Sequence, residues 1–294
     1  MAHTAELVVN PKAIVGEGPI WLPDEQQLYW LDITGNKLFI YNPATNENKT
    51  IDLPQMAGTV VPRASGGLML AVENGFASYD PETRNLEILV DPEADGPEGN
   101  RFNDGKCDPA GRFWAGTMPF AEMKPIGALY RLDIDHNVKR MVGDVTVSNG
   151  IVWTLDESTM YYIDSPTCRI DAFDYDNDTG DVSNRRCVVN VPGEQGVPDG
   201  MTIDVNDNLW VAQFGGGGVN CWDPRTGKCI DSIEIPGAKQ VTAGWFGGPD
   251  LEDLYITTAG HGLDGDGFKE QPNAGGLFVV RPGVTGCETV AYTG

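Results

Sequence analysis

The chain has little of the material that histidine, cysteine-pair or metal-thiolate chemistry needs. It contains three histidines in 294 residues, and none of its six cysteines forms a CxxC pair. His3 falls in the terminus and His136 in an expected turn, so a Ser-His-Asp or His-dyad mechanism has few residues to use. Most of the cysteines fall within strand patterns, and we expect them to be reduced core residues.

Basic residues and long apolar runs are also scarce. There are 20 Lys and Arg against 43 Asp and Glu, which gives a net charge of −23. Such a surface repels nucleic acid and anionic membranes, so we expect neither as a partner. No apolar run approaches the roughly 18 residues of a membrane span, and residues 1–6 lack the basic and apolar regions of a signal peptide. We expect a cytoplasmic protein, as a monomer or weak homodimer.

What the sequence does contain is an apolar strand that recurs at intervals of 40 to 49 residues. Its six copies begin at Leu28, Leu68, Phe113, Met160, Leu209 and Leu254. Five copies follow a turn rich in Asp, Asn, Gly or Glu, each is followed by a second strand, and an edge strand such as 229–233 completes the unit. Four antiparallel strands per unit, repeated six times, predict an all-β, six-bladed β-propeller.

The two ends of the chain bear on whether the repeat closes into a ring. An open solenoid needs a polar cap at each end, and the sequence shows no caps. Residues 6–9 and 289–292 both have the pattern of spare strands, and we expect the N-terminal one to complete the last blade. Because no linker interrupts the repeat, residues 1–294 are predicted to form a single domain.

Four short polar motifs share one position relative to the recurring strand. Their central residues stand 10 or 11 residues before it, at the expected start of an innermost strand; they are Glu17, Asn103, Asn149 and Asp199. In a closed ring these starts surround the central channel, so residues more than 180 apart in sequence can meet. Each motif alone is typical of a turn. Their common register is what predicts a shared site.

The donor set of this predicted site indicates a hard metal ion. Carboxylate and amide oxygens without His or Cys favour Ca²⁺, Mg²⁺ or Mn²⁺ over a structural Zn²⁺ site. Two carboxylates and one or two amides leave positions for water and substrate, as Lewis-acid catalysis requires. Small residues at the same register, 57–58 and 243–244, are expected to leave room for a ligand. Residues 264–267 resemble the start of a calcium loop, but the downstream spacing predicts a solvated turn.

Longer motifs such as 100–106, 115–118 and 198–201 resemble those of the SMP-30/gluconolactonase/regucalcin-like family, and the resemblance runs from Glu17 to about Phe278. It implies a propeller with one divalent cation, Ca²⁺, Zn²⁺, Mg²⁺ or Mn²⁺, in the central channel, and hydrolysis of sugar lactones such as gluconolactone. By motif, Glu17, Asn149 and Asp199 would bind the metal, and Asp199 would also be the general base.

The same resemblance implies that Arg101 and Asn103 hold the hydroxyls of the substrate. Regucalcin-like members carry a glutamate pair soon after the Gly-Thr-Met motif, whereas residues 119–124 here contain Glu122 alone. Either Glu122 grips the sugar from a shifted position or that contact is absent. The prolines at 119 and 125 suggest a stiff loop that is either an ordinary surface loop or a lid.

The leading hypothesis is a metal-dependent lactonase in which the cation polarises the lactone carbonyl and Asp199 activates water. Three alternatives stay open. One is a calcium-binding regulatory protein without turnover, another is a metal-dependent esterase or organophosphate hydrolase, and the third is a propeller that serves only as a scaffold.

Overall fold

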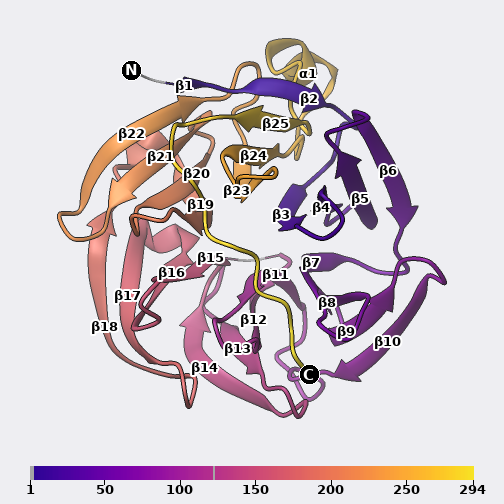
Figure 1. Ribbon diagram of the computed structural model, residues 1–294, viewed down its shortest axis with the longest axis vertical. Coiled ribbons are helices and arrows are strands. Elements are labelled where there is room, and N and C mark those ends of the chain that lie inside the picture. The colour runs from indigo at the N-terminus through magenta and orange to yellow at the C-terminus, as the bar shows by residue number, and fades with distance from the viewer. Residues whose placement is uncertain (1–2, 122) are drawn as a thin grey trace.

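Six antiparallel sheets surround a central axis in the computed structural model, which describes residues 3–121 and 123–294 (Figure 1). Blade 1 contains β3 (Gly16–Leu22), β4 (Gln27–Asp32), β5 (Lys37–Asn42) and β6 (Glu47–Asp52). Blade 2 contains β7 (Ala57–Pro62), β8 (Leu68–Val72), β9 (Gly75–Asp80) and β10 (Asn85–Val90). Blade 3 contains β11 (Asn100–Cys107), β12 (Phe113–Pro119), β13 (Gly127–Leu132) and β14 (Val138–Val145).

The second half of the chain repeats this plan. Blade 4 contains β15 (Ser148–Trp153), β16 (Thr159–Asp164), β17 (Arg169–Asp176) and β18 (Asp181–Asn190). Blade 5 contains β19 (Val197–Ile203), β20 (Leu209–Phe214), β21 (Gly218–Asp223) and β22 (Lys228–Glu234). Blade 6 contains β23 (Val241–Gly247), β24 (Asp253–Thr258) and β25 (Leu277–Val280). The prediction of a six-bladed propeller with four antiparallel strands per blade is confirmed.

The N-terminal strand completes the last blade, as predicted. Strand β2 (Glu6–Val9) pairs antiparallel with β25, so that Leu7 lies opposite Phe278. The preceding β1 (His3–Thr4) pairs in parallel with β22 of blade 5. The two ends of the repeat are thus joined by main-chain hydrogen bonds, and the innermost strands β3, β7, β11, β15, β19 and β23 contact one another in a closed ring.

All six innermost strands carry a pairing irregularity near their first residues. The register with the next strand shifts within the intervals 17–20, 57–59, 102–105, 149–151, 198–201 and 241–243. A β-bulge adds a residue to one strand and re-aims the side chains beside it. The four predicted site residues lie in or at the edge of these irregularities, which is the structural counterpart of their common register in the sequence.

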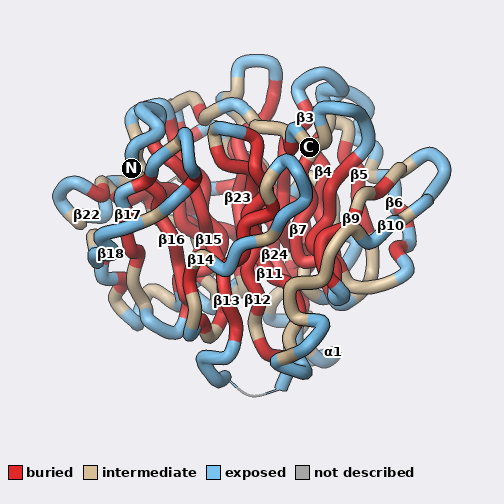
Figure 2. Tube along the Cα trace, turned by 90° about the horizontal axis from the view of Figure 1, so that it is seen from below, coloured by how far each residue is buried: buried red, intermediate tan, exposed pale blue. Residues whose placement is uncertain are grey.

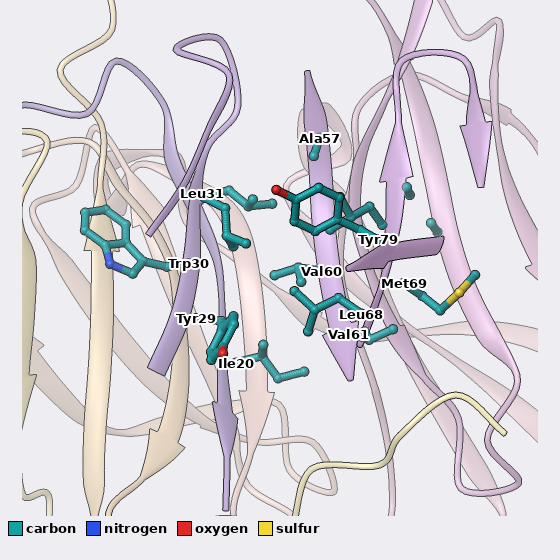
Figure 3. Close-up of a cluster of buried hydrophobic side chains, with 14 of the residues drawn as sticks. Ile20, Tyr29, Trp30, Leu31, Ala57, Val60, Val61, Leu68, Met69 and Tyr79 are labelled. Atoms are coloured by element: carbon teal, nitrogen blue, oxygen red, sulfur yellow. The ribbon is translucent and has the colours of Figure 1, made fainter. Parts of the chain in front are cut away.

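The core lies between neighbouring blades. Figure 3 shows Ile20 and Leu31 of blade 1 facing Val60 and Leu68 of blade 2, and these side chains are at most 3% exposed. Full burial of such a side chain stabilises the fold by about 1.5–3 kcal/mol. In Figure 2 the buried strands fill the middle of the molecule and the exposed segments lie around its outside.

The Asp-rich turns predicted from the sequence are held by buried carboxylates. Asp108 accepts hydrogen bonds from the backbone N–H of Arg112 at 2.9 Å and from Trp114 Nε1 at 2.8 Å, and it forms an ion pair with Arg112 Nε at 2.7 Å. Asp204 occupies the same position in blade 5 and accepts from Trp210 Nε1 at 3.0 Å. These carboxylates satisfy turn N–H groups that would otherwise be buried without partners.

The C-terminal segment differs from the spare strand predicted at 289–292. It forms single β-bridges, such as that between Arg63 and Tyr292, and crosses the middle of the ring, where it is yellow in Figure 1. Thr289 Oγ1 donates to Trp21 O at 2.7 Å, and the Tyr292 N–H donates to Pro62 O at 2.8 Å. Because Trp21 and Pro62 lie at the ends of β3 and β7, this segment covers the end of the channel opposite Glu17.

Two smaller predictions need correction. Residues 264–267 begin a short helix, α1 (Gly265–Glu270), because the Asp264 carboxylate accepts from the N–H groups of Asp266 and Gly267 as an N-cap. All six cysteines are free, but only Cys107 and Cys221 are buried, while Cys187 and Cys229 are exposed. No helix among the described residues is long and apolar enough to cross a membrane.

Candidate metal and substrate site

The four residues predicted from their common register lie at the same end of the channel. Glu17, Asn103, Asn149 and Asp199 come from β3, β11, β15 and β19, and all are at most 7% exposed. Asn103 Nδ2 lies 3.3 Å from Asn149 Oδ1, and Asn149 is hydrogen-bonded to Asp199. The negative charge of Glu17 raises the pKa of Asp199, so these two carboxylates also lie close together. The structure therefore brings these four residues, one from each of four blades, to one end of the channel.

Asn149 is held by polar groups on both sides. Its Nδ2 donates to Ser165 Oγ at 2.8 Å, and Ser165 Oγ donates in turn to Pro198 O at 2.7 Å. Because Pro198 precedes Asp199 in β19, this chain of bonds fixes blade 4 against blade 5. The amide of Asn149 is thereby oriented with its oxygen toward Asn103.

Arg101 and Asn103 form a second unit. Arg101 Nη1 donates to Asn103 Oδ1 at 2.8 Å and to Phe102 O at 2.9 Å, while Asn103 Nδ2 donates to Ser148 O at 2.8 Å. Burial lowers the pKa of Arg101 to about 10, and the charges of Glu17 and Asp199 partly offset this effect. The guanidinium remains charged at neutral pH, and its other N–H groups make no hydrogen bond among the described residues.

Burial makes the carboxylates costly to ionise. Loss of solvation, followed by the charge of Asp104, raises the pKa of Glu17 to about 8, although the Gly18 N–H donates to Glu17 Oε2 at 2.7 Å. Burial and then the charges of Glu17 and Asp104 hold the pKa of Asp199 well above its usual range. A pair of buried carboxylates with raised pKa values is typical of a site that receives a positive charge or a proton.

Asp104 is a channel residue that the sequence pattern did not single out. It is 3% exposed, its Oδ1 accepts from the Gly105 N–H at 2.7 Å, and its Oδ2 has no hydrogen-bond partner in the described structure. The Lys106 ammonium lies 3.8 Å from Oδ1. Strict alternation along β11 would point Asn103 and Asp104 to opposite faces, but the irregularity between Phe102 and Gly105 brings both near the channel. The Asn-Asp-Gly motif at 103–105 could have indicated a bulge here, and a bulge would have predicted that Asp104 also lies near the channel.

The donor set fits a hard divalent cation. Glu17, Asp199 and Asp104 bring three buried carboxyl groups, against two cationic side chains, those of Arg101 and Lys106. No three His, Cys, Asp or Glu side chains gather as a metal-holding group within residues 3–121 and 123–294. A site here would therefore need an amide oxygen, such as that of Asn149, beside the two carboxylates, which is the set that the family resemblance implies.

The small residues of blades 2 and 6 lie against the neighbouring innermost strands. A Cβ on Gly58 would lie 2.5 Å from the backbone oxygens of Phe102 and Asn103. A Cβ on Gly200 would lie 2.5 Å from that of Ala243. The small residues at these positions let neighbouring innermost strands approach each other. That they also leave room for a ligand stays a prediction.

The loop after β12 lies outside the strands. Phe120 is 46% and Met123 70% exposed, and the Phe120 N–H donates to Gly99 O at 2.8 Å. The predicted sugar contact, Glu122, lies outside the described residues, so its role remains a prediction.

Comparison with known proteins extends the resemblance to the whole chain. The family model for the SMP-30/Gluconolactonase/LRE-like region matches residues 15–260. Regucalcin of Danio rerio is 43% identical over 98% of each chain, and the Bacillus subtilis protein named "Putative sugar lactone lactonase YvrE" is 41% identical over 99% of each. A crystal structure described as a calcium-binding protein, regucalcin, from Agrobacterium tumefaciens has a TM-score of 0.94 and 27% identity, and the match covers 99% of this chain and 98% of that one. The chain belongs to the SMP-30/gluconolactonase/LRE-like family.

Proposed function

We propose that this protein is a hydrolase that opens sugar lactones with the help of one divalent cation held by Glu17, Asn149 and Asp199. The observation that carries the proposal is the convergence of two buried carboxylates with raised pKa values and an oriented amide at one end of the channel. Such a cation would supply positive charge against the negative charge that develops on the lactone carbonyl oxygen. The family and the name of the Bacillus subtilis relative support a lactone as the substrate class.

In this proposal Asp199 acts as the general base. Its carboxylate takes a proton from the attacking water as the new carbon–oxygen bond forms, and returns it to the ring oxygen as the ester bond breaks. Asp199 must be ionised to begin this cycle, and burial beside Glu17 and Asp104 opposes ionisation. Positive charge at the site is therefore a requirement for turnover, because Arg101 offsets only part of that cost.

The substrate is held by the Arg101–Asn103 unit. The guanidinium uses Nη1 to bind Phe102 O and Asn103 Oδ1, which leaves its remaining donors for hydroxyl or carbonyl oxygens of the substrate. A fixed donor set of this kind suits a polyhydroxylated ring and lowers the entropy cost of orienting it. Glu122 would add a further contact to a hydroxyl. An aryl ester or organophosphate would not use these donors fully, so we place such substrates second.

A calcium-binding role without turnover is the second candidate. It is favoured by the description of the Agrobacterium tumefaciens protein as calcium-binding. The two roles would use the same carboxylates, and they differ in whether bound cation supports hydrolysis.

The test is hydrolysis of glucono-1,5-lactone, followed in a pH-stat with cation present, for the unchanged protein and for Asp199→Asn. The proposal expects hydrolysis above the spontaneous rate that falls by about 10²- to 10⁴-fold in the variant, the range that general-base catalysis supplies. Asp223→Asn, at the end of β21 in the same blade, is the matched control and should keep full activity. Equal activity of Asp199→Asn and the unchanged protein would remove Asp199 from the mechanism.

A further inference from the structure

A cavity lies at the end of the channel opposite the candidate metal site. Its volume is about 380 Å³, within the range of small-molecule sites. Its lining includes Lys106, Val152, Ile203, Trp245 and Val290. Lys106, Val152 and Ile203 stand three, three and four residues beyond Asn103, Asn149 and Asp199 on the same strands. At a rise of about 3.3 Å per residue, the cavity lies roughly 10 Å along the channel from the candidate metal site.

The C-terminal segment forms the outer wall of this cavity. Cys287, Glu288 and Val290 line it, and Thr289 between them accepts from Trp245 Nε1 at 3.0 Å. This hydrogen bond fixes the C-terminal segment to blade 6 beside the Trp245 ring, which also lines the cavity. The cavity belongs to the face covered by this segment and not to the end that carries Glu17.

Lys106 is the polar group buried in this cavity. Its side chain is 10% exposed, its nearest carboxylate oxygen is Asp104 Oδ1 at 3.8 Å, and no hydrogen bond is made by its Nζ among the described residues. Nζ also lies 5.2 Å from the centre of the Trp245 ring. An ammonium has three donors and loses solvation when buried, so acceptors from outside the protein would stabilise it.

The remaining lining is apolar inside and acidic at the rim. The apolar side chains include those of Val152, Trp153, Ile203, Trp245 and Val290. The carboxylates at the cavity are Glu157, which accepts from Asn177 Nδ2, and the exposed Glu288. An anion would meet these carboxylates, the Asp104 charge and a protein of net charge −23. A cation would meet Lys106. An uncharged ligand avoids both penalties.

We propose that this cavity is a second ligand site, which binds an uncharged and largely apolar small molecule through one carbonyl group. The carbonyl oxygen accepts hydrogen bonds from Lys106 Nζ, and the apolar body packs against Trp245 and Val290. The proposal goes beyond the hydrolase activity, because no residue that lines the cavity is proposed to bind the cation or the substrate; the charge of Lys106 acts on Glu17 through space only.

The first experiment measures binding of 4-phenyl-2-butanone, an aryl ketone, to the cation-loaded protein by calorimetry. Lys106→Met keeps the length of the side chain and removes its donors, and is expected to weaken binding by about 10- to 100-fold, the value of a hydrogen bond to a charged group. Lys12→Met is the matched control, since Lys12 also lies over an aromatic ring, Phe268, but on the surface. Val290→Trp fills the cavity without touching the donor and should abolish binding even if Lys106→Met is poorly folded.

The second experiment locates the ligand by thiol alkylation, read residue by residue by mass spectrometry. Bound ketone is expected to slow alkylation of Cys287, which lines the cavity, and to leave the exposed Cys187 and Cys229 unchanged. The proposal is overturned by unchanged Cys287 alkylation, by equal binding to Lys106→Met and the unchanged protein, or by absence of binding at the solubility limit. Tighter binding of 3-phenylpropionate than of the ketone would overturn the assignment of an uncharged ligand.

Discussion

Asn103 Nδ2 lies 3.3 Å from Asn149 Oδ1, so a residue proposed to hold substrate in blade 3 directly contacts a residue proposed to hold metal in blade 4. The same Nδ2 donates to Ser148 O at 2.8 Å, which anchors Asn103 to the strand that carries Asn149. Metal binding and substrate binding are therefore expected to depend on one another.

Asn103→Ala is the change that tests this dependence. Loss of the amide removes the hydrogen-bond donor to Asn149 Oδ1, while Ser165 still holds Asn149 Nδ2. Groups behind a metal ligand typically affect affinity by about 10- to 100-fold. We expect weaker Mn²⁺ binding by calorimetry, although Asn103 is not itself a proposed ligand. Asn137→Ala, in an exposed turn where the Asn137 side-chain amide donates to Asp135 Oδ2, is the control and should bind Mn²⁺ normally. Unchanged affinity in Asn103→Ala would show that the two sites are separate.

The stability of the cation-free protein should fall as pH rises. Burial raises the pKa of Glu17 from 4.5 to about 8, so the folded state binds a proton that the unfolded state releases. The stabilisation is complete below about pH 4.5 and is lost as pH rises toward 8, and Asp199 acts in the same direction. Thermal unfolding midpoints measured by circular dichroism at intervals of about one pH unit, from pH 5 to pH 8, give the dependence of stability on pH.

Glu17→Gln isolates the contribution of that carboxyl. The amide is neutral at every pH, so the variant should show a shallower decline than the unchanged protein. Saturating divalent cation should flatten the decline in the unchanged protein, because a ligand that binds only the folded state stabilises it. An unfolding midpoint that rises from pH 5 to pH 8 in the cation-free protein would contradict a raised pKa for these buried carboxyls.

Arg101→Lys should weaken substrate binding more than it slows chemistry. Lysine keeps the charge but cannot bind Phe102 O and Asn103 Oδ1 while still offering a planar set of donors to the substrate. We expect KM for gluconolactone to rise by about tenfold, the effect of losing one hydrogen bond to a charged group, with a small change in kcat. Arg84→Lys, on an outer turn, should leave both parameters unchanged. A fall in kcat at constant KM would instead show that Arg101 stabilises the transition state more than the bound substrate.

Asp108→Ala should destabilise the fold without touching the channel. Asp108 is fully buried and holds Arg112 Nε at 2.7 Å and Trp114 Nε1 at 2.8 Å, so its removal leaves a buried cation unpaired. The expected loss is about 3–5 kcal/mol in the free energy of unfolding, measured by urea denaturation. Asp174→Ala, which breaks the exposed pair with Arg186, should give an unchanged urea midpoint. Similar midpoints for both variants would show that the Asp108 carboxylate does not hold the turn.

The repeat and the common register were sufficient to predict the architecture and the four channel residues. The apolar strands determine which residues lie between blades. Counting 10 or 11 residues back from each recurring strand leads to the starts of the innermost strands, where Glu17 and Asp199 lie. The closing strand at residues 6–9 was also predictable, because a ring of six blades lacks one partner for β25.

The remaining features depend on contacts between segments distant in sequence. Asp104 reaches the channel because pairing shifts between Phe102 and Gly105, and alternation alone points it elsewhere. Gly58 must be a glycine because the backbone of blade 3 lies against it. The sequence of blade 2 alone does not show this contact. The C-terminal segment has a strand-like pattern, yet Tyr292 bridges only to Arg63 because the segment crosses the ring rather than lying along one sheet.

Cation bound by Glu17, Asn149 and Asp199 is proposed to be required for lactone hydrolysis, because it would supply the positive charge that favours ionised Asp199. The most direct measurement strips the protein with chelator, then titrates Ca²⁺, Mg²⁺, Mn²⁺ or Zn²⁺ while recording both bound metal and gluconolactone hydrolysis in the unchanged protein and in Glu17→Gln. We expect activity to return in proportion to one bound cation per chain, and Glu17→Gln to require far more cation. Full activity of the stripped protein, or binding of one cation without any hydrolysis, would show that the cation is not what drives lactone opening.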